Sequence, residues 1–363
     1  MAGRFAICIA FAVVGHSTAS ACGYGIYRWQ GPQGLETVLQ QFDDVQARLD
    51  SAPTAEERAA LRDHLERLTA AVDEVAGQRH ATVSRLFWHT DLEQAKIAAA
   101  ESGKPILSLR MLGKLTDEFS CANSRYFRTT LYANKEISDF LREKFVLHWQ
   151  SVRPVPKVTI DFGNGRKLER TVTGNSAHYV LAPDGRPLDV LPGLYSPQEF
   201  LRWLNRTQAL SADYLAATDA GERESVLTAY HRDRLAALDT AELRREDVRL
   251  DDASVALIRR ENPKAFEAGR ISVAKSVAED PILRLVGRFE ASIAADTVRN
   301  ESQLHRKIHE WYLDGEVTGD YDALNERVYS DLFLTPSSDP WLGLAPPDVY
   351  TALDNGGLVG ESR

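Results

Sequence analysis

The feature that most constrains the fold of this 363-residue chain is an alternation of short apolar runs and amphipathic stretches within residues 84–206. The apolar runs have the length of buried strands, and the stretches between them have the spacing of helices. The strands predicted in this way are 86–88, 106–109 and 145–149, and the helices between them are 91–100 and 121–144. This β-α-β-α-β order predicts an α/β fold in which helices cover a central mixed sheet.

Two glycine-containing turns predict two hairpins in the second half of this unit. Gly163-Asn164-Gly165 interrupts the alternating segment 158–172, and Asn-Gly is a strong hairpin signal because both residues accept positive φ. Pro183-Asp184-Gly185 interrupts the apolar segment 178–191 in the same way. A helix over 197–204 is then expected to close the unit.

The segment before this unit has the pattern of two antiparallel helices. Apolar residues recur at helical spacing from Leu35 to Leu49 and from Leu61 to Val75. Thr54 and Glu57 form a capping box at the start of the second helix. We therefore expect a helical hairpin over 33–80, whose apolar stripe either packs against the next unit or binds a partner.

The segment after the unit is predicted to be mostly helical over 207–335. The candidate helices lie near 222–238, 251–260, 281–296 and 301–313. The tail at 336–363 is rich in proline and carries Trp341 and Tyr350, which favours an extended segment with aromatic anchors.

The first 21 residues have the pattern of a secretory signal peptide. Arg4 precedes an apolar run, and Ala19-Ser20-Ala21 supplies the small residues of a cleavage site. The protein is therefore expected in the periplasm or outside the cell, with no transmembrane span, because no later run reaches ~18 apolar residues. Cys22 follows the cleavage site directly, so both plain cleavage and a lipid anchor at Cys22 stay open. Only Cys22 and Cys121 survive cleavage, which allows one disulfide at most.

The charge of the chain limits its partners. A formal net charge of −9, with no basic block to reverse it locally, argues against general nucleic-acid binding. The sequence also carries no phosphate-cradling glycine loop, and no cofactor is expected. A protein partner or a protein thiol substrate stays open.

Three blocks of residues 84–206 resemble the thioredoxin-like family, specifically its exported bacterial members. The blocks are Trp88 with 91–107, Cys121-Ala122-Asn123-Ser124 with 131–146, and 172–176 with 179–185. They resemble the family's first helix and central strand, its active-site helix, and the loop and hairpin that close its active site. The resemblance implies a redox site at the N-terminus of the helix that follows Cys121.

This sequence departs from the family at the residues that carry the chemistry. Ser124 falls on the second cysteine of the family's Cys-x-x-Cys, and Ser176 falls on its cis-proline, where we expect a trans peptide bond. Cys121 alone could still support disulfide isomerisation or an exchange that uses an external thiol. His178, two residues after Ser176, and Arg125 are the candidates for tuning Cys121. Arg128 follows on the same helix.

The sequence leaves two functions open and offers one weak metal motif. The protein is either a single-cysteine thiol-disulfide exchange or isomerase-type protein acting through Cys121, or a non-catalytic binding or assembly module of the cell envelope. His305 and His309, with Glu301 four residues before, could present one face of a helix to a metal. No fourth ligand follows from spacing, so no metal site is predicted.

Overall fold

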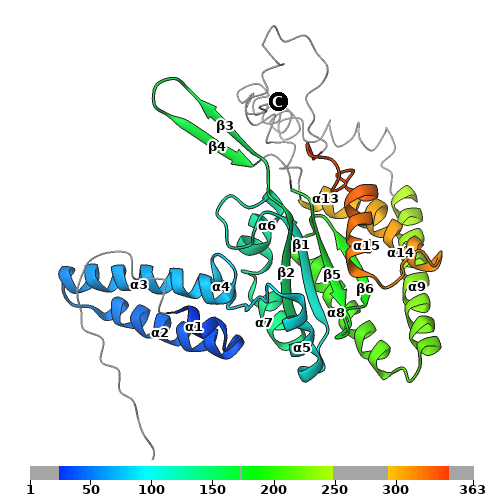
Figure 1. Ribbon diagram of the computed structural model, residues 1–363, viewed down its shortest axis with the longest axis horizontal. Helices are drawn as coiled ribbons and strands as arrows, with labels where there is room; N and C mark the ends of the chain where they lie inside the picture. Colours follow the sequence, from blue (N-terminus) through cyan, green and yellow to red (C-terminus); the bar gives the residue numbers. More distant parts are fainter. Residues whose placement is uncertain (1–23, 172–173, 248–292, 343–363) are drawn as a thin grey trace, which may run out of the picture.

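The computed structural model describes residues 24–171, 174–247 and 293–342, and these form three parts (Figure 1). A helical hairpin lies on one side, a four-stranded mixed sheet with its helices lies in the middle, and a helical C-terminal region lies on the other side. The mixed α/β class and the helical segments on both sides of the sheet are thus confirmed.

Several predicted segments lie outside the described residues. They are the signal peptide (1–21), Cys22, the helix at 251–260, the helix at 281–296 before Ile293, and the tail beyond Leu342.

The N-terminal hairpin consists of two long antiparallel helices with a short helix at each end. Its helices are α1 (Gly25–Arg28), α2 (Pro32–Ser51), α3 (Ala55–Ala76) and α4 (Ala81–Ser84). Val38 and Val72 are fully buried where α2 and α3 face each other. Thr54 caps α3 as predicted, because its hydroxyl accepts the backbone N–H of Glu57 at 3.1 Å. Gly77 ends α3 with a φ of 68°, which glycine adopts without strain.

The sheet contains four strands in the order β2-β1-β5-β6. They are β1 (Ile106–Leu112), β2 (Val146–Arg153), β5 (Ser176–Leu181) and β6 (Pro187–Pro192). β1 and β2 are parallel, whereas β1/β5 and β5/β6 are antiparallel. The central strands β1 and β5 are buried along their whole length, as helices on both faces require.

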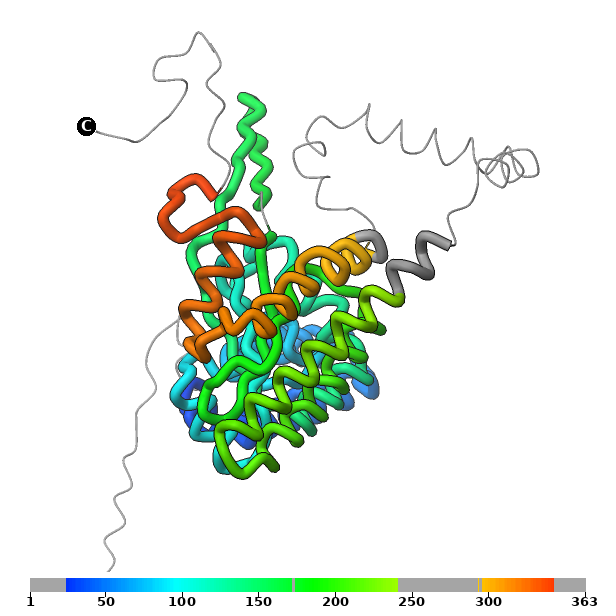
Figure 2. Tube along the Cα trace, turned by 90° about the vertical axis from the view of Figure 1, so that its right-hand side faces the viewer, coloured from blue at the N-terminus to red at the C-terminus, as the bar shows by residue number. Residues whose placement is uncertain are grey.

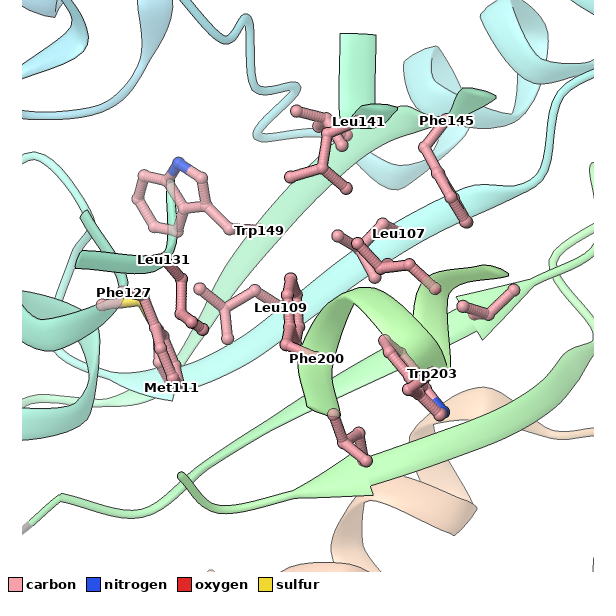
Figure 3. Packing of buried hydrophobic residues seen from close by; sticks show 14 of the residues in the cluster. Leu107, Leu109, Met111, Phe127, Leu131, Leu141, Phe145, Trp149, Phe200 and Trp203 are labelled. Carbon is pink, nitrogen blue, oxygen red and sulfur yellow. The ribbon is translucent and has the colours of Figure 1, made fainter. Parts of the chain in front are cut away.

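Alternate residues of the sheet build two separate layers of core. Leu107, Leu109 and Met111 face one layer, which Figure 3 shows packed against Phe127 and Phe200. The elements that cover this layer are α6 (Ala122–Tyr126), the π-helical turn η1 (Phe127–Leu131), α7 (Lys135–Lys144) and α8 (Pro197–Ala216). The opposite layer is closed by α5 (Leu92–Ser102) and by the C-terminal helices.

The predicted strand at 86–88 is wrong. Only His89 pairs with the sheet, through an isolated parallel bridge to His148 of β2. The backbone of Trp88 is instead used by the helical hairpin: its N–H donates to Ala76, and its carbonyl accepts from the guanidinium of Arg28 at 3.0 Å. The hairpin therefore takes the hydrogen bonds that a further strand would have needed.

The Asn-Gly hairpin forms as predicted but stands apart from the main sheet. β3 (Lys157–Asp161) and β4 (Lys167–Thr171) pair only with each other, and they project away from the body (Figure 1). Ile160 pairs with Leu168, and both side chains are partly buried on the same face of the hairpin.

The C-terminal region covers the β6 side of the sheet. Its elements are α9 (Ala220–Asp247), α13 (Ile293–Arg299), η3 (Asn300–His305), α14 (Arg306–Leu313), α15 (Tyr321–Arg327) and η4 (Val328–Leu332). α9 and α14 lie side by side (Figure 2). They are far apart in the sequence, because 58 residues lie between the end of α9 at 247 and the start of α14 at 306. This packing brings the side chains of two distant helices together beside β6.

Candidate functional site

Cys121 lies where the sequence placed it, at the N-terminus of a short helix. It is the N-cap of α6, and its Sγ atom accepts the backbone N–H of Ser124 at 3.4 Å. The hydroxyl of Ser124 donates to the backbone oxygen of Cys121 at 2.9 Å. Ser124 therefore supports the turn that holds Cys121, in the position where a second thiol would be needed to resolve a mixed disulfide.

The thiol of Cys121 is completely shielded from solvent. Its side chain is 0% exposed and belongs to the main apolar core. Burial raises the pKa of the Cys121 thiol, and the hydrogen bonds from Ser124 offset this only in part. Because the thiolate is the nucleophile in thiol chemistry, a buried thiol with a raised pKa is poorly placed to react.

His178 is buried beside aromatic rings and bonds to a tyrosine. Its ring lies 4.6 Å from the ring of Phe127 and 4.9 Å from that of Phe200, between centroids. Its Nε2 atom is 2.7 Å from the hydroxyl of Tyr132, and its Nδ1 atom has no partner among the described residues. Burial lowers the pKa of His178 to about 3, so the ring is neutral at pH 7 and offers Cys121 no positive charge.

The two arginines on the helix after Cys121 hold loops in place. Arg125 is partly buried and donates to the hydroxyl of Thr171 at 3.1 Å. Arg128 is buried and donates to three backbone oxygens between residues 115 and 118. Burial lowers the pKa of Arg128 to about 10, which still leaves it charged at pH 7. Arg128 thus fixes the loop that precedes Cys121.

The loop at Ser176 is reshaped around Asn123. The described residues contain no cis peptide bond, as expected for Ser176. The amide of Asn123 donates to the hydroxyl of Ser176 at 2.9 Å. A Cβ atom on Gly174 would lie 2.6 Å from the side-chain oxygen of Asn123, so a side chain larger than hydrogen does not fit there without a shift.

A C-terminal segment covers this end of the core. Tyr329 of η4 is buried in the same apolar cluster as Cys121, and a charge on Cys121 would raise its pKa. The hydroxyl of Tyr329 donates to the backbone oxygen of Asn175 at 3.2 Å, and the amide of Asn175 donates to the hydroxyl of Thr335 at 3.0 Å. We call Cys121, Tyr132, His178 and Tyr329 the Cys121 cluster.

A second buried cluster surrounds Asp189 of β6. One carboxylate oxygen accepts the indole N–H of Trp203 at 2.9 Å and the hydroxyl of Tyr230 at 2.7 Å. Its other oxygen lies 3.1 Å from Nε2 of His305, whose Nδ1 lies 3.0 Å from Glu301. We call the group formed by the following residues the Asp189 cluster: Asp189, Tyr230, His231, Glu301, His305 and His309.

In the Asp189 cluster, neighbouring groups of opposite charge keep one another ionised despite burial. Burial favours a neutral His305, but Asp189 and Glu301 raise its pKa to about 9. Burial likewise favours neutral carboxyls, but His305 lowers the pKa of Glu301 to about 2 and that of Asp189 well below its ordinary value. Arg234 lies 3.3 Å from Glu301 and adds a further positive charge. The cluster is therefore ionised at pH 7.

Two neutral histidines complete the Asp189 cluster. Nδ1 of His231 on α9 lies 2.8 Å from Nδ1 of His309 on α14, and Nε2 of His231 lies 3.1 Å from the backbone oxygen of Leu188. Burial lowers the pKa of His231 to about 4 and that of His309 well below its usual range. Both rings are therefore uncharged at pH 7.

An open groove lies between the helical hairpin and the sheet. It has a volume of about 790 Å³ and is lined by residues of α2, α5, α7 and β2, together with the turn that contains Trp29. Trp29 is 92% exposed and Ile97 of α5 is 53% exposed. These are two of the largest apolar side chains that the described residues leave open to solvent.

The sequence pointed to Cys121 and His178 of the Cys121 cluster, and to half of the Asp189 cluster. It placed Glu301, His305 and His309 together from their spacing on one helix, and the structure keeps His305 and Glu301 in contact. It missed Asp189 and His231, which tertiary packing brings to them. A signal existed, because Asp189 is an acidic residue inside the apolar run 187–191, and a buried charge needs a partner.

Comparison with known proteins identifies no relative of this chain: no protein-family model, no curated protein and no solved structure matches it. Among the described helices, none is both long enough and apolar enough to cross a bilayer.

Proposed function

We propose that this chain is an exported, thioredoxin-like protein that acts as a non-catalytic binding module in the cell envelope. The support for a thioredoxin-like unit is its order of elements. α5 and the central strand β1 precede Cys121, a helix begins at Cys121, and the β5–β6 hairpin with α8 follows. The β3–β4 hairpin stands where the family carries a helix.

The observation that carries the non-catalytic part is the enclosure of Cys121. Thiol exchange needs an in-line approach of one sulfur to another, and a side chain with 0% exposure does not permit it. Tyr329 and the bonds of Asn175 to the C-terminal segment cover this end of the core. Neither a neutral His178 nor Ser124 supplies what a reactive thiolate would need.

The groove beside Trp29 is the surface we assign to binding. Its volume falls in the range that holds a small ligand or one to two large side chains of a peptide. Trp29 and Ile97 offer apolar contacts, and side chains of both charges, Glu36, Glu101, Lys104 and Arg142, also line the groove. A tryptophan exposed beside a groove is typical of the hot-spot residues that dominate binding at protein interfaces. We therefore expect an extended protein segment with a large apolar side chain as the occupant.

The test combines a binding arm with a turnover arm. A panel of peptides carrying aromatic and aliphatic residues is titrated onto the mature chain and onto Trp29→Ala and Ile97→Asp variants. Binding should weaken by at least about tenfold in both groove variants, the loss expected when a hot-spot contact is removed. Val83→Asp is the matched control, because Val83 is also an exposed apolar residue (61%) but does not line the groove.

Two outcomes would count against the proposal. One is peptide binding that is equally strong in the groove variants and in the wild type. The other is turnover of a scrambled disulfide substrate that disappears in Cys121→Ala, which would favour the single-cysteine exchange function.

A further inference from the structure

The Asp189 cluster contains a set of side chains that suits a metal ion. Asp189 of β6, His231 of α9 and His309 of α14 each offer one ligand atom, and these atoms all lie within 4.8 Å of one another. All three side chains are fully buried. From this geometry we infer that Asp189, His231 and His309 bind one divalent transition-metal ion, with Zn²⁺ as the best match. The site is separate from Cys121 and the groove, so it stands or falls independently of the proposed function.

His231 is already oriented as a metal ligand. Its Nε2 atom lies 3.1 Å from the backbone oxygen of Leu188, and a carbonyl oxygen only accepts hydrogen bonds. Nε2 therefore carries the proton of the neutral ring, and Nδ1 carries a lone pair that faces His309. Histidines that ligate metals commonly donate their other N–H to a backbone carbonyl, which fixes the tautomer in this manner.

The contact between His231 and His309 is one that a metal ion can replace. Since Nδ1 of His231 is the acceptor, the proton between the rings belongs to Nδ1 of His309, and the two atoms are 2.8 Å apart. Metal–nitrogen bonds of about 2.0–2.1 Å in a tetrahedral site would place the nitrogens about 3.3 Å apart. A separation of the rings by roughly half an ångström, with the proton of His309 moved from Nδ1 to its unpartnered Nε2 so that the ring stays neutral, is enough to admit the ion.

His309 also has an orphaned nitrogen. Its Nε2 atom is buried and has no hydrogen-bond partner among the described residues. A buried nitrogen without a partner is costly, so hydrogen bonding within the described residues does not account for both nitrogens of this ring. Nε2 of His309 is therefore the nitrogen that hydrogen bonding among the described residues of the Asp189 cluster leaves unpaired.

Both oxygens of the Asp189 carboxylate already accept hydrogen bonds. One accepts from Trp203 and Tyr230. The other accepts the backbone N–H of Val190 at 2.8 Å and lies 3.1 Å from Nε2 of His305, so a monodentate metal bond from this oxygen would replace one of these two contacts. His305 is in turn held by Glu301, so the carboxylate is oriented from both sides. Two imidazole nitrogens with one carboxylate suit Zn²⁺, whereas Mg²⁺ and Ca²⁺ prefer sites made of oxygen ligands alone.

The consequence is a structural one. The three ligands come from β6, α9 and α14, and α9 and α14 are not consecutive in the chain. A metal ion at this point would join the C-terminal helices to the edge strand of the sheet. Because the site is buried, its expected effect is on stability rather than on catalysis.

The test is a metal titration of the mature full chain after refolding from denaturant that contains a chelator. ZnCl₂ and CoCl₂ are used as the only probes. One equivalent of Zn²⁺ should bind and raise Tm by several degrees. Co²⁺ should give visible bands of low-coordinate Co²⁺ with nitrogen and oxygen ligands, and no sulfur charge-transfer band from Cys121.

Variants locate the ion. His231→Gln and His309→Gln should each lower the affinity by at least about 100-fold. His64→Gln, which changes a histidine on α3 outside the cluster, should bind as the wild type does. Failure of the refolded wild type to bind stoichiometric Zn²⁺ or Co²⁺ would overturn the inference, as would binding that survives both cluster substitutions. If a variant does not fold, the Co²⁺ spectrum of the wild type still shows whether the chain binds the ion through nitrogen and oxygen ligands.

Discussion

The Cys121 cluster is fully buried and the Asp189 cluster is buried except for partial exposure of Tyr230 and Glu301, yet the two clusters accommodate polar groups in opposite ways. In the Cys121 cluster every group is neutral: burial raises the pKa of the thiol and lowers the pKa of His178 to about 3. In the Asp189 cluster the same burial is overcome by opposite charges, which raise the pKa of His305 to about 9. The buried charged groups thus lie beside β6, away from Cys121, where a thioredoxin-like site is expected.

The difference follows from what each cluster packs against. His178 is surrounded by the rings of Phe127, Phe200 and Trp203, which carry no negative charge to pair with a protonated imidazole. Asp189 meets His305 and Tyr230, which η3 and α9 bring from outside the sheet unit. A buried polar group keeps its charge only where a partner of opposite charge is supplied. The C-terminal region supplies that partner to β6 and only a tyrosine to Cys121.

The largest expected effect is on stability, from Asp189→Asn. The substitution removes the fully buried one of the two carboxylates that hold the charge of His305 and leaves only Glu301, and removal of one partner of a buried pair costs about 3–5 kcal/mol. The free energy of unfolding, measured with urea, should fall by that amount. Cys121→Ala, which removes no charge, should lower it by only about 1–2 kcal/mol. Equal losses in the two variants would remove the distinction between the clusters.

The second effect is a pH dependence of opposite sign for two histidines, His178 of the Cys121 cluster and His305 of the Asp189 cluster. An unfolded chain protonates His178 below its ordinary pKa of about 6.5, whereas the folded chain does so only at about 3. Stability should therefore fall as the pH drops from 6.5 towards 3, by up to about 1.4 kcal/mol per pH unit for this group. His148, whose pKa burial also lowers to about 3, adds a similar loss.

His305 should act on the alkaline side. Its folded pKa of about 9 lies above the ordinary value, so its contribution is complete below about 6.5 and is lost as the pH rises through 9. Urea unfolding from pH 4 to 9, with chelator present, measures both limbs. His178→Gln should flatten the acid limb alone, and His305→Gln the alkaline limb alone. The same limb changing in both variants would contradict the assignment.

The smallest effect concerns the cover over Cys121. Tyr329→Phe removes the hydrogen bond to the backbone oxygen of Asn175, which should lower the free energy of unfolding by about 1 kcal/mol. Alkylation of Cys121 in the folded protein should become faster, because the C-terminal segment is held less firmly. Val83→Ala, an exposed site on α4, should change neither quantity. An unchanged alkylation rate in Tyr329→Phe would show that this bond does not control access to the thiol.

Local patterns predicted local structure well and long-range packing poorly. The capping of α3 by Thr54 and the hairpin around Asn164 follow from neighbouring residues alone, and both are confirmed. The strand predicted at 86–88 failed because the helical hairpin bonds the backbone of Trp88, which no local pattern reveals.

The same limit applies to the sites. Spacing placed Cys121 at a helix N-terminus, and it placed His305 beside Glu301. It could not show that Tyr329 bonds to Asn175 and shares the apolar cluster of Cys121, nor that Asp189 and His231 join His305 and His309, because these contacts connect segments more than 40 residues apart. The burial of Cys121, which decides between the two functions, is a property of that packing.

The reactivity of the Cys121 thiol tests the account most directly. Alkylation of the mature protein by iodoacetamide is followed as a function of pH, both folded and in urea. The account predicts a folded thiol that reacts far more slowly than the unfolded one at every pH, with no reactive thiolate below its ordinary pKa of about 8.5. A folded thiol that reacts rapidly with a pH midpoint below about 7 would contradict it and would make Cys121 a redox centre.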